Sequence, residues 1–272
     1  MRKCIKNIIV WFLYLSGINA LCSFLFRNCA YAVGYHSIAR AGSPEFFTYK
    51  KVTIEAEVFE KHLAYLAAHG HTFVRFSELK DALKKGVRKP TAIFFDDGFK
   101  NNLEIALPIL KKYDIPMTSF VTTGYISGTV QPSQSDEDAA GTGFMLDWLE
   151  IERIKKEGGE IGSHGLSHVK LTECDDRELK KELIESRMEI ARRIAEPPRA
   201  ISYPRGRHND TVVSETKKAG YDFAVTTIEG LNNLQYLEQH PYEIRRIAPK
   251  PYDDFLMFKV KVYAWNLIKC IF

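Results

Sequence analysis

The sequence predicts an α/β fold in which parallel strands form a barrel or a wound sheet with helices around it. Short apolar runs bounded by turn residues alternate with stretches whose apolar residues recur every three or four positions. This alternation is typical of strands followed by amphipathic helices. One apolar run, residues 92–95, leads directly into Asp96 and Asp97, and a Glu-Ile-Gly run leads to His164 and His168. The polar residues of the candidate site therefore follow predicted strands.

The elements can be placed in order along the chain. Gly70 and Gly220 end two of the predicted helices, and Ser77 and Thr172 are expected to cap the starts of two others. Strands are expected at residues 31–37, 72–74, 92–95, 116–122, 160–162, 200–206, 223–227 and 243–247. Helices are expected at residues 57–69, 76–85, 101–113, 149–157, 172–193 and 212–219. Residues 124–143 are rich in Gly, Ser and Thr without periodicity, and a loop this long is usually functional or mobile.

Length and composition indicate one globular domain with short extensions. The chain has 272 residues, of which 45% are hydrophobic and 26% charged, which are ordinary values for a soluble domain. The net charge of +4 is too small to indicate nucleic-acid binding, and the basic residues are dispersed. The five cysteines show no CxxC spacing, so they predict neither a disulfide framework nor a thiolate metal site.

Both ends of the chain are apolar and basic. Residues 1–29 fit a membrane-spanning anchor, a signal peptide, an interfacial helix or a helix packed on the domain. We expect membrane association without cleavage, because Arg27 is unfavourable near a cleavage site and a cut would fall against the first strand. Residues 251–272 predict an amphipathic helix that packs on the N-terminal helix or lies on a membrane surface.

The adjacent carboxylates Asp96 and Asp97 call for a nearby cation, since two such groups do not both stay ionised at low cost. Successive strand residues point to opposite sides, so one carboxylate can bind a metal while the other handles protons. His164 and His168 supply two imidazoles, which with one carboxylate make a three-ligand site of the zinc type with an open position for water. The alternative for the carboxylates alone is a solvated Asp-Gly turn.

Three motifs in order give the chain a family resemblance. They are Phe95-Asp96-Asp97-Gly98, Gly162-Ser163-His164-x-x-x-His168 and Ser202-Tyr203-Pro204-x-Gly206. From about Tyr35 to about Ile247 the chain resembles the NodB-like polysaccharide deacetylases, carbohydrate esterase family 4. The resemblance implies a distorted (β/α)7 barrel of the TIM type over residues 30–250. It also implies hydrolysis of N-acetyl, sometimes O-acetyl, groups on a glycan, and a divalent metal, usually zinc, with cobalt, nickel or manganese as alternatives.

The resemblance also implies residue roles. Asp96 corresponds to the catalytic base, and Asp97, His164 and His168 correspond to the metal ligands. Tyr203 stands where family members hold the oxyanion with a backbone N–H. The implied partner is an N-acetylated polysaccharide or oligosaccharide.

The sequence departs from the family pattern in three places. Gly165 replaces the usual Ser or Thr after the first metal histidine, and Arg205 replaces a common aromatic, where it could contact an anionic sugar. The Leu-x-His motif that often carries the catalytic acid is missing near the end, and His208 and His240 lack its context. The general acid is therefore unassigned at this point.

Two further residues are candidates for substrate binding. His36 ends the first predicted strand, where it is either a site residue or a hydrogen-bonded histidine in the barrel mouth. Trp148 either faces a sugar ring or is a buried aromatic that starts the next helix. The competing functions are a catalytically silent glycan-binding or membrane-scaffold relative, and a hydrolase of the same fold that acts on O-acetyl esters or non-glycan amides. The apolar ends favour the cell envelope, with a secreted or cytoplasmic-face location as alternatives.

Overall fold

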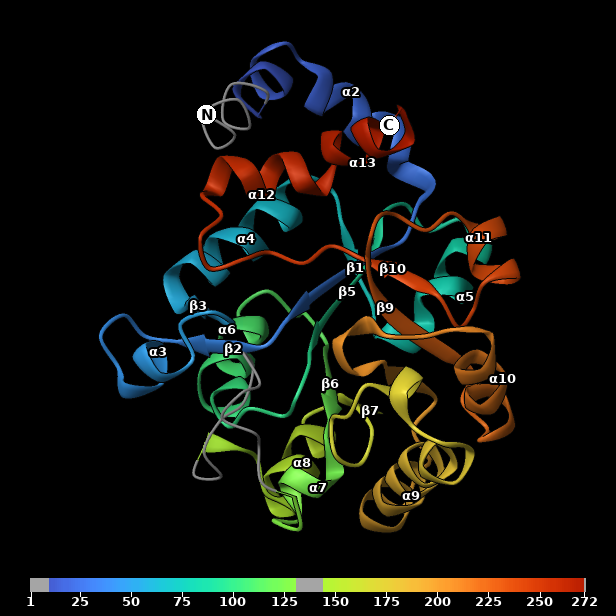
Figure 1. The fold of residues 1–272 in the computed structure, drawn as a ribbon. Helices are drawn as coiled ribbons and strands as arrows, with labels where there is room; N and C mark the ends of the chain where they lie inside the picture. The colour runs from blue at the N-terminus through green and yellow to red at the C-terminus, as the bar shows by residue number, and fades with distance from the viewer. Residues whose placement is uncertain (1–9, 131–143, 272) are drawn as a thin grey trace.

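The computed structural model describes residues 10–130 and 144–271. Its centre is a barrel of parallel strands with helices around it (Figure 1), which confirms the predicted fold class. Among the described residues, hydrogen-bonded neighbours follow one another in the order β1, β5, β6, β7, β8, β9 and β10. Their bounds are Tyr31–Tyr35, Pro90–Phe95, Met117–Val121, Glu160–Ser163, Ala200–Ser202, Phe223–Glu229 and Ile244–Arg246.

The two ends of this order meet and close the barrel. The amide of Gly34 donates to the carbonyl of Ile247 at 2.9 Å, and the amide of Ile247 donates to Ala32 at 2.8 Å. A short strand, β4 (Thr72–Phe73), pairs with β5 outside the ring. Two further short strands, β2 (Ser37–Ala39) and β3 (Thr53–Glu55), form a separate parallel pair beside the carboxyl end of β1.

Helices connect the strands and cover the outside of the barrel. The larger ones are α4 (Ala56–Ala68), α5 (Leu79–Lys84), α8 (Trp148–Lys156), α9 (Asp176–Ile194), α10 (Asp210–Lys218) and α11 (Leu234–Gln239). The shorter ones are α3 (Pro44–Thr48), α6 (Leu107–Lys111) and α7 (Thr123–Ile126). Single turns of 3-10 helix lie at Phe26–Asn28, Phe76–Glu78, Leu171–Glu173 and Pro204–Gly206. Most of the predicted loop 124–143 lies outside the described residues, but its first residues form α7.

Side chains fill the inside of the barrel, and this packing leads to the site. Phe94 and Phe120 meet edge to face with ring centroids 5.4 Å apart. A Cβ added to Gly34 on β1 would lie 2.5 Å from the Phe94 ring. Only glycine therefore fits at this position of β1 without displacing that ring. Alternate residues of a strand share a face, so the inward positions after Gly34 and Phe94 are His36 and Asp96. The strand period therefore turns both side chains toward the barrel mouth.

Three helices differ from the sequence prediction. The predicted helix 101–113 is a π-helical segment (Asn102–Ala106) followed by α6, because Pro108 has no amide for the regular hydrogen bond. The long charged helix starts later than expected, and Asp175 caps it instead of Thr172. Ser77 is no cap either, since Phe76–Glu78 forms a 3-10 turn before α5.

The chain ends pack together at the amino ends of the strands. Residues 10–15 are helical, and the chain turns at Gly17 into α2 (Ile18–Leu25). The expected single C-terminal helix is two helices, α12 (Phe255–Val262) and α13 (Ala264–Ile271), and Figure 1 shows α13 beside α2. Within the described ranges, no helix combines the length and the apolar character that crossing a membrane requires.

Candidate active site

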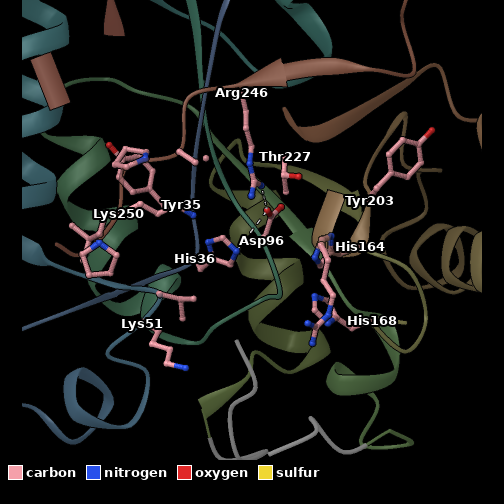
Figure 2. Close-up of a pocket in the computed structure, with 17 residues that line it drawn as sticks. Tyr35, His36, Lys51, Asp96, His164, His168, Tyr203, Thr227, Arg246 and Lys250 are labelled. Atoms are coloured by element: carbon pink, nitrogen blue, oxygen red, sulfur yellow. Dashed lines mark hydrogen bonds and ion pairs between the residues drawn. The ribbon is translucent and has the colours of Figure 1, made fainter. Parts of the chain in front are cut away.

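The predicted catalytic and metal residues come together at the carboxyl ends of the strands, where barrel enzymes build their sites. A cavity of about 220 Å³ opens there, and its lining includes His36, Asp96, His164, His168 and Arg246. These side chains come from the ends of β1, β5, β7 and β10 and from the loop after β7 (Figure 2). Residues far apart in the sequence thus converge on one small volume.

Asp97, His164 and His168 form a compact and buried cluster of metal-ligating type. Their ligand atoms all lie within 4.8 Å of one another. Asp97 Oδ1 lies 3.3 Å from Nε2 of His164 and 3.5 Å from Nε2 of His168. Apart from these imidazole contacts, both Asp97 oxygens are buried without a hydrogen-bond partner among the described residues. One carboxylate and two imidazoles facing a common point fit a divalent metal of the zinc type.

A backbone carbonyl fixes the orientation of the first histidine. Nδ1 of His164 lies 2.7 Å from the carbonyl oxygen of Ser202, at the end of the neighbouring strand β8. This contact places the proton on Nδ1 and leaves Nε2 to face Asp97. A second hydrogen bond of this kind holds the tautomer of most metal-ligating histidines.

Glu182 holds the loop between the two histidines. Its carboxylate accepts the amides of Leu166 at 2.8 Å and Ser167 at 3.0 Å, and also the Ser167 hydroxyl. Gly165 has a φ of 78°, and a Cβ there would lie 3.1 Å from the Glu182 carboxylate. Where the family usually has Ser or Thr, this chain has Gly165. The loop is held there by the buried carboxylate of Glu182 on α9.

The charges in the cluster act on one another. Burial alone would raise the pKa of the Asp97 carboxyl, but the His164 hydrogen bond and the charges of His168 and His36 outweigh it. The net effect holds the pKa of Asp97 below its usual range. Burial lowers the pKa of His164, but Asp96 and Asp97 more than reverse this, so it lies above its usual value. The carboxylates give the cluster a negative potential that suits a cation.

Asp96 is separate from this cluster and has its own cation. Nη1 of Arg246 donates to Oδ2 of Asp96 at 2.7 Å, and both side chains are buried. Nε2 of His36 lies 4.0 Å from the same oxygen, and the His36 side chain is 19% exposed in the cavity. Figure 2 shows Arg246 reaching Asp96 from above, His36 on its left, and His164 and His168 on its right.

Three residues around the cavity have left-handed backbone conformations. The φ angles are 74° for Asp97, 60° for His168 and 56° for Arg205. Non-glycine residues adopt this region infrequently, and such positions concentrate at functional sites. The surrounding structure holds these three residues in a backbone conformation of higher energy, and this conformation fixes the direction of each side chain.

The Tyr203 amide, to which the family resemblance gives the oxyanion role, is hydrogen-bonded within the sheet in this structure. The N–H of Tyr203 donates to the carbonyl of Val225 at 3.1 Å, as part of the pairing between β8 and β9. Its ring is buried and points away from Asp96 (Figure 2). The amide thus has a partner in the sheet, while Tyr203 is also part of the cavity lining.

The remaining predicted residues divide into two groups. His36 and Arg205 line the cavity as expected for substrate contacts. Trp148 lies outside the described cavity lining, buried at the start of α8, and its Nε1 donates to the Ser127 hydroxyl at 3.2 Å. The structure therefore favours the buried-aromatic interpretation of Trp148 over contact with a sugar.

Two residues of the site were not identified from the sequence. The sequence places Arg246 in the predicted strand 243–247 and Glu182 in the predicted helix 172–193, without a role in the site for either. Glu182 is in fact 6% exposed. A signal for Arg246 did exist, because arginine is unusual in a predicted barrel strand and a buried carboxylate needs a counter-charge.

The loop contact of Glu182 makes a testable prediction. Glu182→Gln keeps the shape but weakens the hydrogen bonds to the loop, so we expect about 10- to 100-fold weaker zinc binding. Calorimetric titration of zinc into metal-free protein measures it. Glu185→Gln, at an exposed position of the same helix, is the matched control and should bind as the wild type does. Equal affinity for both variants would contradict the role of Glu182.

Comparison with known proteins agrees with this geometry. The family model described as polysaccharide deacetylase matches residues 84–224, just over half of the chain. A curated relative, the poly-beta-1,6-N-acetyl-D-glucosamine N-deacetylase of Staphylococcus aureus, is 27% identical over 222 residues. That alignment covers 75% of this chain and 73% of the relative.

Solved structures give the same fold. The Streptococcus pyogenes deacetylase PplD in complex with acetate has a TM-score of 0.70 at 24% identity and covers 89% of this chain and 97% of its own. BC0361, a polysaccharide deacetylase from Bacillus cereus, has a TM-score of 0.70 at 24% identity, with 86% and 69% covered. The chain belongs to the polysaccharide deacetylase family, and it is a hydrolase of carbon–nitrogen bonds other than peptide bonds.

Proposed function

We propose that the protein is a metal-dependent deacetylase that removes N-acetyl groups from a glycan. The main support is that two adjacent carboxylates, Asp96 and Asp97, have different surroundings. Asp97 faces two imidazoles, whereas Asp96 faces an arginine and the open cavity. A protein that only bound glycan would have no need of a second carboxylate kept out of the ligand set.

Asp97, His164 and His168 would hold the metal. A divalent ion bound there would polarise the acetamide carbonyl and lower the pKa of a water to about 7. The ligand set suits zinc, and cobalt, nickel or manganese are also compatible with it.

Asp96 is the proposed base. Arg246 occupies its Oδ2, while Oδ1 is buried and accepts no hydrogen bond from the described residues. This oxygen is therefore the one that takes a proton from the attacking water. Arg246 holds the carboxylate in place through its hydrogen bond to Oδ2.

His36 is the proposed general acid, which the sequence left unassigned. Breaking the C–N bond releases an amine that must be protonated while the acetyl group leaves as acetate. His36 lines the cavity next to Asp96, whereas His208 contacts Glu243 and the Gly206 carbonyl. The acid thus comes from the first strand of the barrel instead of a motif near the end of the chain.

The proposed substrate is a polymer that contains N-acetylglucosamine. The support is the name of the Staphylococcus aureus relative together with the extent of that alignment. Arg205, which lines the cavity, would contact a neighbouring sugar and favour one that carries an anionic group. Trp148 has no part in this proposal.

Turnover should depend on a bound metal ion and on Asp96. Purified protein should release acetate from N-acetylglucosamine oligosaccharides, stop when a chelator is added and recover with zinc. Asp96→Asn should bind zinc as the wild type does but lose activity by at least about 100-fold, since the base is removed and the ligands remain. Acetate assays and metal analysis on the same samples measure both. A fully active Asp96→Asn variant would refute the assignment of the base.

The roles of His36 as acid and Asp96 as base can be distinguished with two substrates. His36→Asn should lower the rate of deacetylation by about 100-fold or more, because the amine is a poor leaving group without a proton. It should largely keep its activity on p-nitrophenyl acetate, whose leaving group needs no acid. Asp96→Asn should lose both activities, and His240→Asn, at an exposed site, serves as the control. Equal losses on the two substrates in His36→Asn would exclude the acid role.

A further inference from the structure

An exposed apolar surface on the N-terminal helices has no role in the site described above. Six of its large side chains are between 55% and 72% exposed. We call this set the N-terminal apolar face, and it consists of Trp11, Phe12, Leu15, Leu21, Phe24 and Leu25. Apolar surface gathered in this way marks an interaction site more often than a free surface.

The opposite sides of the same helices are fixed to the domain. Val10 and Leu13 are buried in the main core, as is Cys22. Asn19 is 5% exposed, and its Oδ1 accepts the amide of Ala264 at the start of α13 at 3.3 Å. Because residues three or four apart share a helix face, this packing turns positions 11, 12 and 15, and likewise 21, 24 and 25, outward together. The exposure is therefore a consequence of how the helices dock.

The segments that carry this face and pack behind it contain basic but no acidic residues. Neither residues 1–44 nor residues 255–272 contain Asp or Glu. The basic residues of these segments are Arg2, Lys3, Lys6, Arg27, Lys259 and Lys269, together with two that lie elsewhere. Arg40 follows β2 at the other end of β1, and Lys261 is buried and paired with Asp253. The carbonyl of Arg27 accepts the amide of Lys89 at 2.8 Å, which brings the exposed Lys85 and Arg88 to the same end of the barrel.

From this combination we infer that the protein docks on the surface of an anionic lipid bilayer through the N-terminal apolar face. Tryptophan, phenylalanine and leucine on one face with basic residues beside them are typical of helices that lie in the membrane interface. Basic residues near such a helix add attraction to anionic headgroups. A second copy of this chain is a less favourable partner for the N-terminal apolar face, because the basic residues of the two copies would repel each other.

The docking geometry would direct the active site away from the bilayer. The Tyr31 hydroxyl donates to the carbonyl of Phe26 at 3.1 Å, so the N-terminal helices lie at the amino end of β1. His36 and Asp96 lie beyond the opposite ends of the strands, and five strand residues span about 16 Å. Figure 1 shows α2 and α13 together at one end of the domain. The cavity would therefore open toward a glycan chain in the space above the membrane surface.

Vesicle flotation with the full chain tests this inference. The wild type should float with vesicles of equal parts phosphatidylcholine and phosphatidylglycerol, less with phosphatidylcholine alone, and less at high salt. The triple variant Phe12→Ser/Leu15→Ser/Phe24→Ser should bind the anionic vesicles at least about tenfold more weakly. The control Leu149→Ser/Met188→Ser changes two equally exposed apolar residues on α8 and α9 and should float like the wild type.

A charge variant and an activity assay complete the design. Lys85→Glu/Arg88→Glu changes exposed side chains only and should also weaken flotation with the anionic vesicles. Acetate release from a soluble oligosaccharide should be unchanged in all variants, which separates this inference from the proposed function. A wild type that floats with neither vesicle overturns the inference. So does a triple variant that turns from dimer to monomer in sedimentation while its flotation stays unchanged.

Discussion

Two adjacent carboxylates, Asp96 and Asp97, are buried at the end of β5, and charge buried without compensation destabilises a fold by several kcal/mol. The compensation comes from the ends of other strands: β1 provides His36, β7 leads to His164, and β10 provides Arg246. The charge of Asp96 is therefore compensated only once β10 has closed the barrel beside β1. The same arrangement divides their chemistry, because one receives two imidazoles and the other a guanidinium.

The barrel interior makes this convergence possible. Glycine on β1 lies against the Phe94 ring, and the aromatic rings of neighbouring strands pack edge to face. Filled layers of this kind fit the width of the barrel interior. The alternation of side chains along each strand then directs His36 and Asp96 into the barrel mouth. The left-handed backbone at Asp97 and His168 turns these side chains toward each other just beyond the strands.

The metal-type cluster could be predicted from the sequence because it depends on local order. Asp97 follows an apolar strand, and His164 and His168 are four residues apart in a loop after another one. The partners that support it could not be predicted in the same way. Arg246 is 150 residues from Asp96, and only barrel closure brings them together. Glu182 looks like any other charged residue of a long helix until the loop packs on it.

Backbone roles were harder still to predict. The amide of Tyr203 has its partner in β9, so its availability depends on strand pairing that its own motif does not encode. The fold class could be predicted from the alternation of strands and helices. The π-helical segment before Pro108, where a regular helix was expected, could not. His36 gained a specific proposed role only when the structure placed it within 4.0 Å of Asp96.

The proposed chemistry requires that Asp97, His164 and His168 bind one metal ion. X-ray absorption spectroscopy at the zinc edge, on protein loaded with one equivalent of zinc, detects such a site. We expect nitrogen and oxygen ligands at about 2.0–2.1 Å with the scattering of two imidazole rings. His168→Gln should reduce this imidazole signal to one ring. A spectrum with sulfur ligands, or an imidazole signal unchanged in His168→Gln, would contradict the account.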